Sequence, residues 1–460
     1  MKTSKVLIGI CLLTLWGCST DEGDFTEKDT NQSIEKNTSS VPTHEIIKNE
    51  IVIQYNRKNL SEEDKLFIVN QFETDYKFKI TDRKTCDCDN DNLELWTVNL
   101  TNSKFVKIEE TIMNLKGDEP KGGVEANLNF YFQIKNDPIS GNQTSTLIEK
   151  TVAMNNDDAV NIAILDTGID YDFFPEPFLY NSSNTSGCSN EISGWDFVNH
   201  DNDPRDDNGH GTIVTKIITN QLDRYNIPYE IMPVKAFDHN GRGSYWASVC
   251  GINHIAKKQD NFIVNTSFGF YKLTEQNIFK NIIDDASDRL LILASAGNLG
   301  IDTDIPGNEH YPSGYNSANV LTVGGYTIKD FFGAPIHGSP YVSGLSRAEG
   351  SNYGKLNIDA LAPFDDHEVK LTTYPRNLND PIVVFAEGTS FANAEVTARA
   401  AQLFNETNGT PLAVKKRTLD SGYKQLGLNG FIDEGKVIVR NIINSSNPIP
   451  VHYNNPSNPQ

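Results

Sequence analysis

Three polar residues stand at the ends of apolar segments, and their types suit nucleophilic catalysis. Asp166 follows the apolar run Val160 to Leu165, His210 follows the turn residue Gly209, and Ser390 opens a helical pattern. A carboxylate can orient a histidine, and that histidine can take the proton of a serine hydroxyl. The sequence therefore predicts a nucleophilic serine, provided that the fold brings the three side chains together.

Each of these residues also has an ordinary structural interpretation. Asp166 begins an Asp-Thr-Gly turn, which is typical of aspartic peptidases as well. Such enzymes need two carboxylates that share a proton, and the chain has no second Asp-Thr-Gly, so only a dimer would supply it. A single histidine is often structural, and serine is a common residue at a helix start.

The elements that must position these residues have the pattern of an α/β fold. Short apolar runs recur after residue 158, and helical patterns such as Trp246 to Lys257 and Thr274 to Arg289 lie between them. The runs are Val160 to Leu165, Phe262 to Val264, Leu290 to Ala294, Val320 to Val323 and Ile358 to Leu361. Continuous apolar strands that alternate with helices predict a parallel sheet covered on both faces. Catalytic residues lie at the carboxyl ends of strands in such sheets.

Six motifs of this chain resemble those of the subtilase family of serine peptidases. They surround Asp166, His210 and Ser390 and include Ala294 to Asn298, Asn265 to Gly269 and Asn240 to Ser244. The chain order Asp, His, Ser is that of subtilisin. The resemblance covers about residues 135–445 and implies a subtilisin-like parallel sheet flanked by helices. Departures are Ile213, Thr215 and Lys216 after His210, and Ala394 after Ser390; none of them removes a reacting group.

The resemblance also implies roles for individual residues. Asp166, His210 and Ser390 would form the catalytic triad, and the amide of Asn298 would stabilise the oxyanion. Two edges would bind the substrate backbone; they contain Gly241, Gly243, Ser244, Ser267, Phe268 and Gly269. No cofactor is implied and no metal ligand is assigned. A Ca²⁺ ion is an open alternative near Asp201, Asp203, Asp206 and Asp207, where the second interpretation is that Asp206 and Asn208 brace the turn before His210.

Residues 50–132 predict a separate small α+β domain. Strand-like and helical stretches alternate in the order βαββαβ, which is typical of a ferredoxin-like fold. Ser61 and Asp64 have the pattern of a helix start, Tyr76 to Ile80 is strand-like, and Phe105 to Leu115 is helical. Beside a subtilase, such a domain is similar to an inhibitory propeptide. We expect a cut between about residues 130 and 150, in the polar stretch Lys135 to Thr146.

Residues 1–18 have the pattern of a secretory signal. Lys2 and Lys5 precede a short apolar segment that ends at Leu15-Trp16-Gly17-Cys18 and resembles a bacterial lipobox. This resemblance implies lipid on Cys18 and a cell-envelope lipoprotein, at the outer membrane or surface of a Gram-negative bacterium. Cutting between residues 130 and 150 would then free the catalytic domain unless the propeptide stays bound. Polar composition predicts a disordered linker over 19–49 and a disordered tail over 446–460.

The charge of the chain bears on its partners. The 460 residues carry a net charge of −21, which argues against nucleic-acid binding. No stretch after residue 20 is long and apolar enough for a membrane helix. We therefore expect protein or peptide substrates, the chain's own propeptide and the membrane as partners, and a monomer.

Four cysteines remain after Cys11 and Cys18. Cys86, Cys88, Cys188 and Cys250 allow three full pairings, and their spacing matches no zinc ribbon or finger. Cys250 lies in a helical pattern, and we expect it to be a buried free thiol. A metal site at Cys86 and Cys88 is a weaker alternative.

The whole pattern predicts a secreted, lipid-anchored serine endopeptidase that is made as a zymogen. One alternative is a processing peptidase dedicated to one exported peptide. Another is an inactive peptide-binding lipoprotein, against which the presence of Asp166, His210, Ser390 and Asn298 argues.

Overall fold

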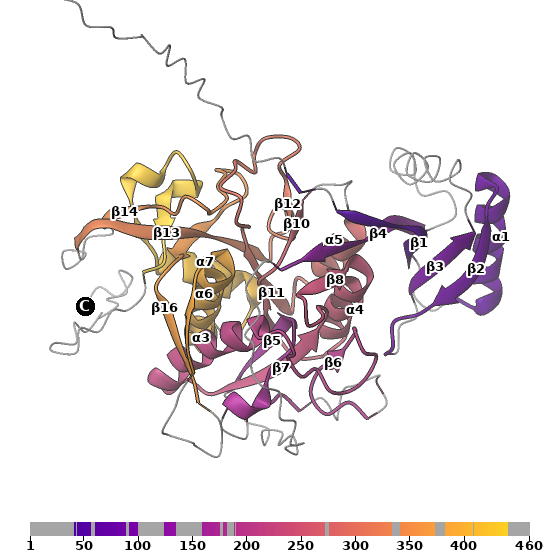
Figure 1. The fold of residues 1–460 in the computed structure, drawn as a ribbon, viewed down its shortest axis with the longest axis horizontal. Helices are drawn as coiled ribbons and strands as arrows, with labels where there is room; N and C mark the ends of the chain where they lie inside the picture. The colour runs from indigo at the N-terminus through magenta and orange to yellow at the C-terminus, as the bar shows by residue number, and fades with distance from the viewer. Residues whose placement is uncertain are drawn as a thin grey trace, which may run out of the picture. The chain divides into compact units, whose positions relative to one another are not determined.

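The computed structural model of the chain (Figure 1) describes most of 159–439 and part of 41–134. The described residues are 41–42, 44–56, 60–88, 92–99, 124–134, 159–174, 178–181, 188, 190–271, 276–333, 341–372, 382–407 and 409–439. The predicted signal segment with Cys18, the linker up to residue 40, the helix 105–115, the stretch 135–146 and the tail 446–460 lie outside these residues.

A mostly parallel sheet forms the centre of the larger region. Its strand order is β18-β19-β15-β13-β11-β9-β5-β7-β6, with β14 paired to β13. Every neighbouring pair from β19 to β6 is parallel, and only β14 and β18 run antiparallel to their partners. The strands are β5 (Val160–Asp166), β6 (Trp195–Asp196), β7 (Tyr229–Lys235), β9 (Phe262–Thr266), β11 (Leu290–Ser295), β13 (Val320–Gly333), β14 (Ser343–Arg347), β15 (Ala360–Pro363), β18 (Tyr423–Lys424) and β19 (Lys436–Val437). The predicted α/β class is confirmed.

Helices cover both faces of this sheet. Ile162 and Ile164 of β5 pack in a core with residues of α3 (His210–Arg224), α6 (Thr389–Phe404) and α7 (Pro411–Asp420). Ala163 and Leu165 point to the other core, with α4 (Tyr245–Ala256) and α5 (Asn277–Asp285). Because both faces are buried, the strands have continuous apolar sequences. Two short antiparallel pairs complete the region: β10 (Phe270–Tyr271) with β12 (His310–Tyr311), and β16 (His367–Leu371) with β17 (Ile382–Ala386).

The N-terminal domain is an antiparallel sheet with one described helix. It contains β1 (Glu45–Tyr55), α1 (Glu62–Tyr76), β2 (Lys79–Lys84), β3 (Leu93–Asn99) and β4 (Val124–Gln133). The strand order is β2-β3-β1-β4, and β4 continues onto β8 (Arg242–Ser244) of the larger region. The predicted N-cap of α1 is present: Ser61 and Asp64 form a reciprocal capping box.

Two predicted boundaries in this domain are wrong. The linker was expected to reach residue 49, but β1 begins at Glu45, because Glu45 and Ile46 pair with Tyr131 and Phe130 of β4. The strand expected from Tyr76 begins at Lys79 instead. Tyr76 is the last residue of α1, and the helix ends at Lys77, whose φ of 56° is left-handed.

Candidate active site

Asp166 and His210 meet where β5 ends and α3 begins. Oδ1 of Asp166 lies 2.7 Å from Nδ1 of His210, and both side chains are fully buried. A Cβ on Gly211 would lie 2.2 Å from the carbonyl oxygen of Gly168, so glycine is what lets α3 start this close to the end of β5. A carboxylate on Nδ1 fixes the orientation of the imidazole and leaves Nε2 for a reacting group.

Ser390 lies in the first turn of α6, beside the same histidine. The ring of the next residue, Phe391, lies 5.6 Å from the ring of His210, so α3 and α6 approach each other here. The hydroxyl of Ser390 donates to the carbonyl oxygen of Ser267 at 2.9 Å, and Nε2 of His210 is buried without a partner among the described residues. The serine–histidine bond is therefore not formed in this state. Catalytic hydrogen bonds of this kind often tighten only when substrate binds.

Asn298 follows β11 and has a fixed amide orientation. Its Oδ1 accepts hydrogen bonds from the backbone N–H and the hydroxyl of Thr389, each at 2.9 Å. Its Nδ2 is on the side of Gly388, where an added Cβ would lie 3.3 Å away. With the acceptor oxygen occupied, the N–H donors of the amide are left for another partner, and Asn298 lines the same cavity as Ser390. An oxyanion formed at Ser390 would need such a donor.

A cavity of about 330 Å³ joins these groups to one of the two predicted substrate-binding edges. Ser267, Phe268 and Gly269 line it together with Asn298 and Ser390. The other edge, Gly241 to Ser244, is occupied by the chain itself: β4 pairs antiparallel with β8.

The end of β4 leads toward Ser390. Phe132 pairs with Gly243, and the backbone N–H of Ile134 donates to the carbonyl oxygen of Gly241 at 2.8 Å. Ile134, the last described residue before the gap, lines the same cavity as Ser390. The edge predicted to bind substrate backbone is therefore already paired in the way that an extended peptide would pair with it.

The sequence of this region matches a known family. A sequence model described as the subtilase family, Peptidase_S8, matches residues 157–431, which is more than half of the 460 residues. The chain belongs to the subtilase family. Its catalytic region therefore has the subtilisin-like fold that the motifs predicted.

Several curated subtilases are similar to this chain. The Cell wall-associated protease of Bacillus subtilis (strain 168) is 28% identical over 277 residues, which are 59% of this chain and 26% of that protein. The Thermophilic serine proteinase of Bacillus sp. (strain AK1) is 26% identical, over 60% of this chain and 59% of that protein. Both alignments thus cover less than two thirds of the relative's length. A cold adapted subtilisin-like serine proteinase of known crystal structure is 22% identical with a TM-score of 0.45, and the match covers 63% of this chain and 94% of that one.

The acidic loop of this subtilase braces the turn before His210. Oδ1 of Asp206 accepts from the N–H groups of Asn208 and Gly209, and Oδ2 accepts from the N–H and hydroxyl of Thr212. Burial raises the pKa of Asp206, and these four donors lower it in part. Asp207 forms an ion pair with the buried Lys235 at 2.6 Å. Ca²⁺ at this loop stays an untested alternative.

The departures from the family pattern have local explanations. The hydroxyl of Thr215 donates to the carbonyl oxygen of Gly211 within α3. Nζ of Lys216 donates to the carbonyl oxygen of Phe173 at 3.1 Å, and its ammonium lies over the ring of Phe174. Burial lowers the pKa of Lys216. The larger side chains of this helix are thus accommodated by the 171–174 turn, away from the reacting groups.

Sequence reasoning missed His310, which lines the same cavity. Its ring fills the space beside Gly269, where an added Cβ would lie 2.2 Å from Nε2. Nδ1 lies 2.7 Å from the hydroxyl of Ser313, and the ring packs edge-on against Tyr271. Burial, with a smaller contribution from the nearby His44, lowers the pKa of His310 to about 3. Tyr311, Pro312 and Ser313, which follow His310, lie where the family pattern expects them, but that resemblance assigns no role to the histidine, and only the fold places its ring in this cavity.

The prediction for Cys250 is wrong. Cys250 forms a disulfide with Cys86, and Cys88 forms one with Cys188. Helical position does not prevent pairing, since Cys250 on α4 faces the loop that follows β2. In this form neither Cys86 nor Cys88 offers a thiolate to a metal.

Proposed function

We propose that this subtilase is a serine endopeptidase that hydrolyses peptide bonds through Asp166, His210 and Ser390. The observation that carries the proposal is the buried 2.7 Å contact between Asp166 and His210 beside the start of α6. A histidine that stood alone at the protein surface would not need a buried carboxylate to orient its ring. Ser390 and Asn298 line one cavity, so the proposed nucleophile and oxyanion donor are near each other.

The reaction would proceed in two halves. Ser390 Oγ rotates from the carbonyl of Ser267 and attacks the peptide carbonyl carbon, while Nε2 of His210 takes its proton. His210 then protonates the leaving amine, and Asp166 stabilises the imidazolium that forms in between. The Nδ2 group of Asn298 and the backbone N–H of Ser390 hold the oxyanion. A water molecule then attacks the acyl-enzyme through the same steps and releases Ser390.

A fluorophosphonate probe tests the nucleophile. We expect the activated protein to be labelled, and Ser390→Ala to lose both labelling and hydrolysis while its folded structure survives. Ser313→Ala is a matched control, because this serine lies near the cavity but bonds to His310. Labelling of Ser390→Ala at the parent rate would contradict the assignment. An unlabelled parent would favour the inactive peptide-binding lipoprotein, and a casein digest compared with a peptide library would separate a general from a dedicated peptidase.

We propose also that the N-terminal domain keeps the enzyme inactive until the chain is cut. The support is that β4 occupies the β8 edge and that Ile134, the residue after β4, lines the cavity of Ser390. The expected cut lies just after Ile134, at the start of the range of about 130 to 150. N-terminal sequencing of the active protein beside Ser390→Ala would test this. An active form that still carries residues before 130 in one unbroken chain contradicts it.

The lipid anchor on Cys18 and the cell-envelope location remain proposals from the sequence. Among the residues that the structure describes, no helix is long and apolar enough to cross a membrane. The test is incorporation of labelled palmitate, which the parent should show and Cys18→Ser should lack. A parent without label would show that the lipobox interpretation is wrong.

A further inference from the structure

Two disulfides join the N-terminal domain to the catalytic domain. Cys86 and Cys88, in the loop after β2, bond to Cys250 of α4 and to Cys188 before β6. All four residues are buried in one core cluster with residues of α4. The bonds span 164 and 100 residues of sequence, so they connect parts that the chain itself joins only through the segment after β4.

The position of these bonds decides what a cut can release. Both cysteines of the N-terminal domain precede β4, and both of their partners follow β5. Any cut between Ile134 and Val160 therefore leaves the two pieces covalently joined. This inference rests on the proposed cut after Ile134, and it reverses one expectation from the sequence: residues preceding the cut, Cys18 included, stay attached to Ser390.

We propose that the two disulfides form a latch that keeps the inhibitory domain on the enzyme after cleavage, and that a dithiol reductant opens it. A tethered domain has an effective concentration of about millimolar beside its binding edge, so β4 continues to compete with substrates for β8. Cleavage alone then relaxes the inhibition only in part. Full activity follows when the bonds are reduced and the domain leaves.

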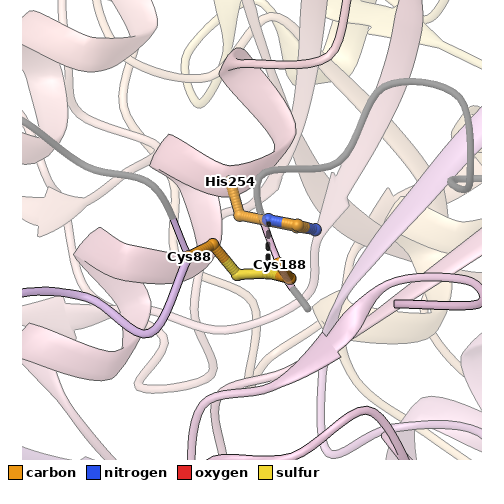
Figure 2. A group of neighbouring side chains, drawn as sticks. All are labelled: Cys88, Cys188 and His254. Atoms are coloured by element: carbon orange, nitrogen blue, oxygen red, sulfur yellow. Dashed lines mark hydrogen bonds between the residues drawn. A yellow bond between two sulfur atoms is a disulfide. The ribbon is translucent and has the colours of Figure 1, made fainter. Parts of the chain in front are cut away.

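The Cys88–Cys188 bond lies beside polar side chains. Figure 2 shows His254 next to Cys188; its Nδ1 lies 3.9 Å from Sγ of Cys188. Nε2 of the same ring lies 3.0 Å from Oε1 of Glu191. Lys258 pairs with the same carboxylate at 2.9 Å. For Cys86 and Cys250, no described side chain hydrogen-bonds to the sulfur atoms. Burial lowers the pKa of His254, and the carboxylate of Glu191 raises it in part. When Nδ1 carries a proton, it stabilises the thiolate of the departing Cys188, and a better leaving thiolate speeds exchange.

The opening step follows from this arrangement. A thiolate of the dithiol attacks Sγ of Cys88, the bond to Cys188 breaks, and its electron pair leaves on Cys188 beside His254. The second thiolate of the reductant then displaces Cys88 and closes the reductant's own disulfide. Two electrons pass from the dithiol to the protein, and its two thiol protons end on Cys88 and Cys188.

The retention test uses the full chain with Ser390→Ala and a cutting sequence for an unrelated protease in place of residues 141–146. External cutting makes the result independent of whether the protein processes itself. After cutting, we expect one species on a denaturing gel without reductant and two fragments with dithiothreitol. Two fragments without reductant, or four cysteines that react with iodoacetamide before reduction, would overturn the latch.

The inhibition test uses the same cutting sequence in the chain with Ser390 intact. Dithiothreitol should raise hydrolysis of a chromogenic peptide at least about tenfold after cutting, since it removes a millimolar competitor. The paired variant Cys86→Ser with Cys88→Ser should be fully active on cutting and insensitive to reductant. If that variant does not fold, Cys188→Ser with Cys250→Ser serves. Equal activity of the cut parent before and after reduction would overturn the inhibitory role of the latch.

The order of opening tests His254. At limiting dithiothreitol, iodoacetamide should label Cys188 before Cys250, and His254→Gln should slow this labelling about tenfold. His200→Gln is the control, because His200 contacts Asp87 between the two cysteines but neither sulfur. Simultaneous labelling of Cys188 and Cys250 in the parent would overturn the role of His254. The retention test and the inhibition test would then decide whether the latch exists.

Discussion

The sheets of the N-terminal and catalytic domains are covered in different ways. The parallel sheet of the catalytic domain lies between helices of its own region, α3, α6 and α7 on one face and α4 and α5 on the other. In the N-terminal sheet, Ile51 and Ile53 pack with α1, whereas Val52 of β1 and Phe130 of β4 belong to the core that contains α4 and α5. The smaller domain therefore completes its core only on the larger one.

This difference indicates which domain depends on the other. A half-covered apolar sheet face needs a partner, and here the partner is the surface that also binds β4 at the β8 edge. Polar bonds add to it: the hydroxyl of Tyr245 and the backbone N–H of Ile278 both donate to Oδ1 of Asn127. In the proposed function, the chemistry lies in the self-covered domain, and control of access lies in the dependent one.

The largest expected effect tests the catalytic side of this comparison. Asp166→Asn should lower kcat about 10⁴-fold, because an amide on Nδ1 favours the wrong imidazole tautomer. Peptide hydrolysis by the cut, reduced enzyme measures it. Asp170→Asn is the control, since this carboxylate pairs with Arg205 and not with His210. A loss below about tenfold in Asp166→Asn would mean that His210 is not the base.

The second prediction tests the dependence of the N-terminal domain. Phe132 packs against the rings of Phe237, Phe268 and Phe270 of the catalytic domain. Phe132→Ala should weaken docking by about 3–5 kcal/mol, the usual result of deleting a buried phenyl ring. Hydrolysis of a chromogenic peptide by the uncut chain should rise accordingly. Phe67→Ala, at a ring 70% exposed on α1, should change nothing; equal effects would contradict a specific docking face.

The third prediction concerns the oxyanion donor. Asn298→Ala should lower kcat about 10²–10³-fold with little change in KM, because the amide stabilises charge that exists only in the transition state. Thr389→Val is the matched variant: it keeps the amide of Asn298 but removes one of the two bonds that orient it. The decrease in kcat of Thr389→Val should be smaller than that of Asn298→Ala. A larger decrease in Thr389→Val would mean that Asn298 is structural.

The smallest effect concerns His310, which lies where both domains meet. Its pKa is lowered to about 3, so between pH 6.5 and 3 the unfolded chain binds a proton that the folded chain does not. The contribution of His310 to the free energy of unfolding should therefore decrease as the pH is lowered through this window, by at most about 1.4 kcal/mol per pH unit, and be constant above it. Urea unfolding of Ser390→Ala, with and without His310→Gln, measures the slope. His200→Gln, whose side chain is 63% exposed, should keep the parent slope; an unchanged slope in His310→Gln contradicts the shift.

The sequence by itself was sufficient for the strands of the parallel sheet and for the residues proposed to react. Strands buried on both faces, such as β5, β9 and β11, have continuous apolar sequences; Asp166 is the last residue of β5, and Asn298 lies three residues after the end of β11. Local patterns were sufficient too for Ser61 at the start of α1. In each case the local structure depends on residues that are close in sequence, so the sequence pattern is enough to predict it.

Only the tertiary structure decided which distant segments meet. The pairing of β4 with β8, the two disulfides and the position of His310 each join residues that no local pattern connects. Four cysteines allow three pairings, and the choice depends on which α-carbons come within reach, here 5.6 Å for Cys86 and Cys250 and 4.4 Å for Cys88 and Cys188. Cys250 was predicted to be a free thiol because it lies in a helical pattern, and its partner is 164 residues away in the N-terminal domain, where no local pattern indicates it.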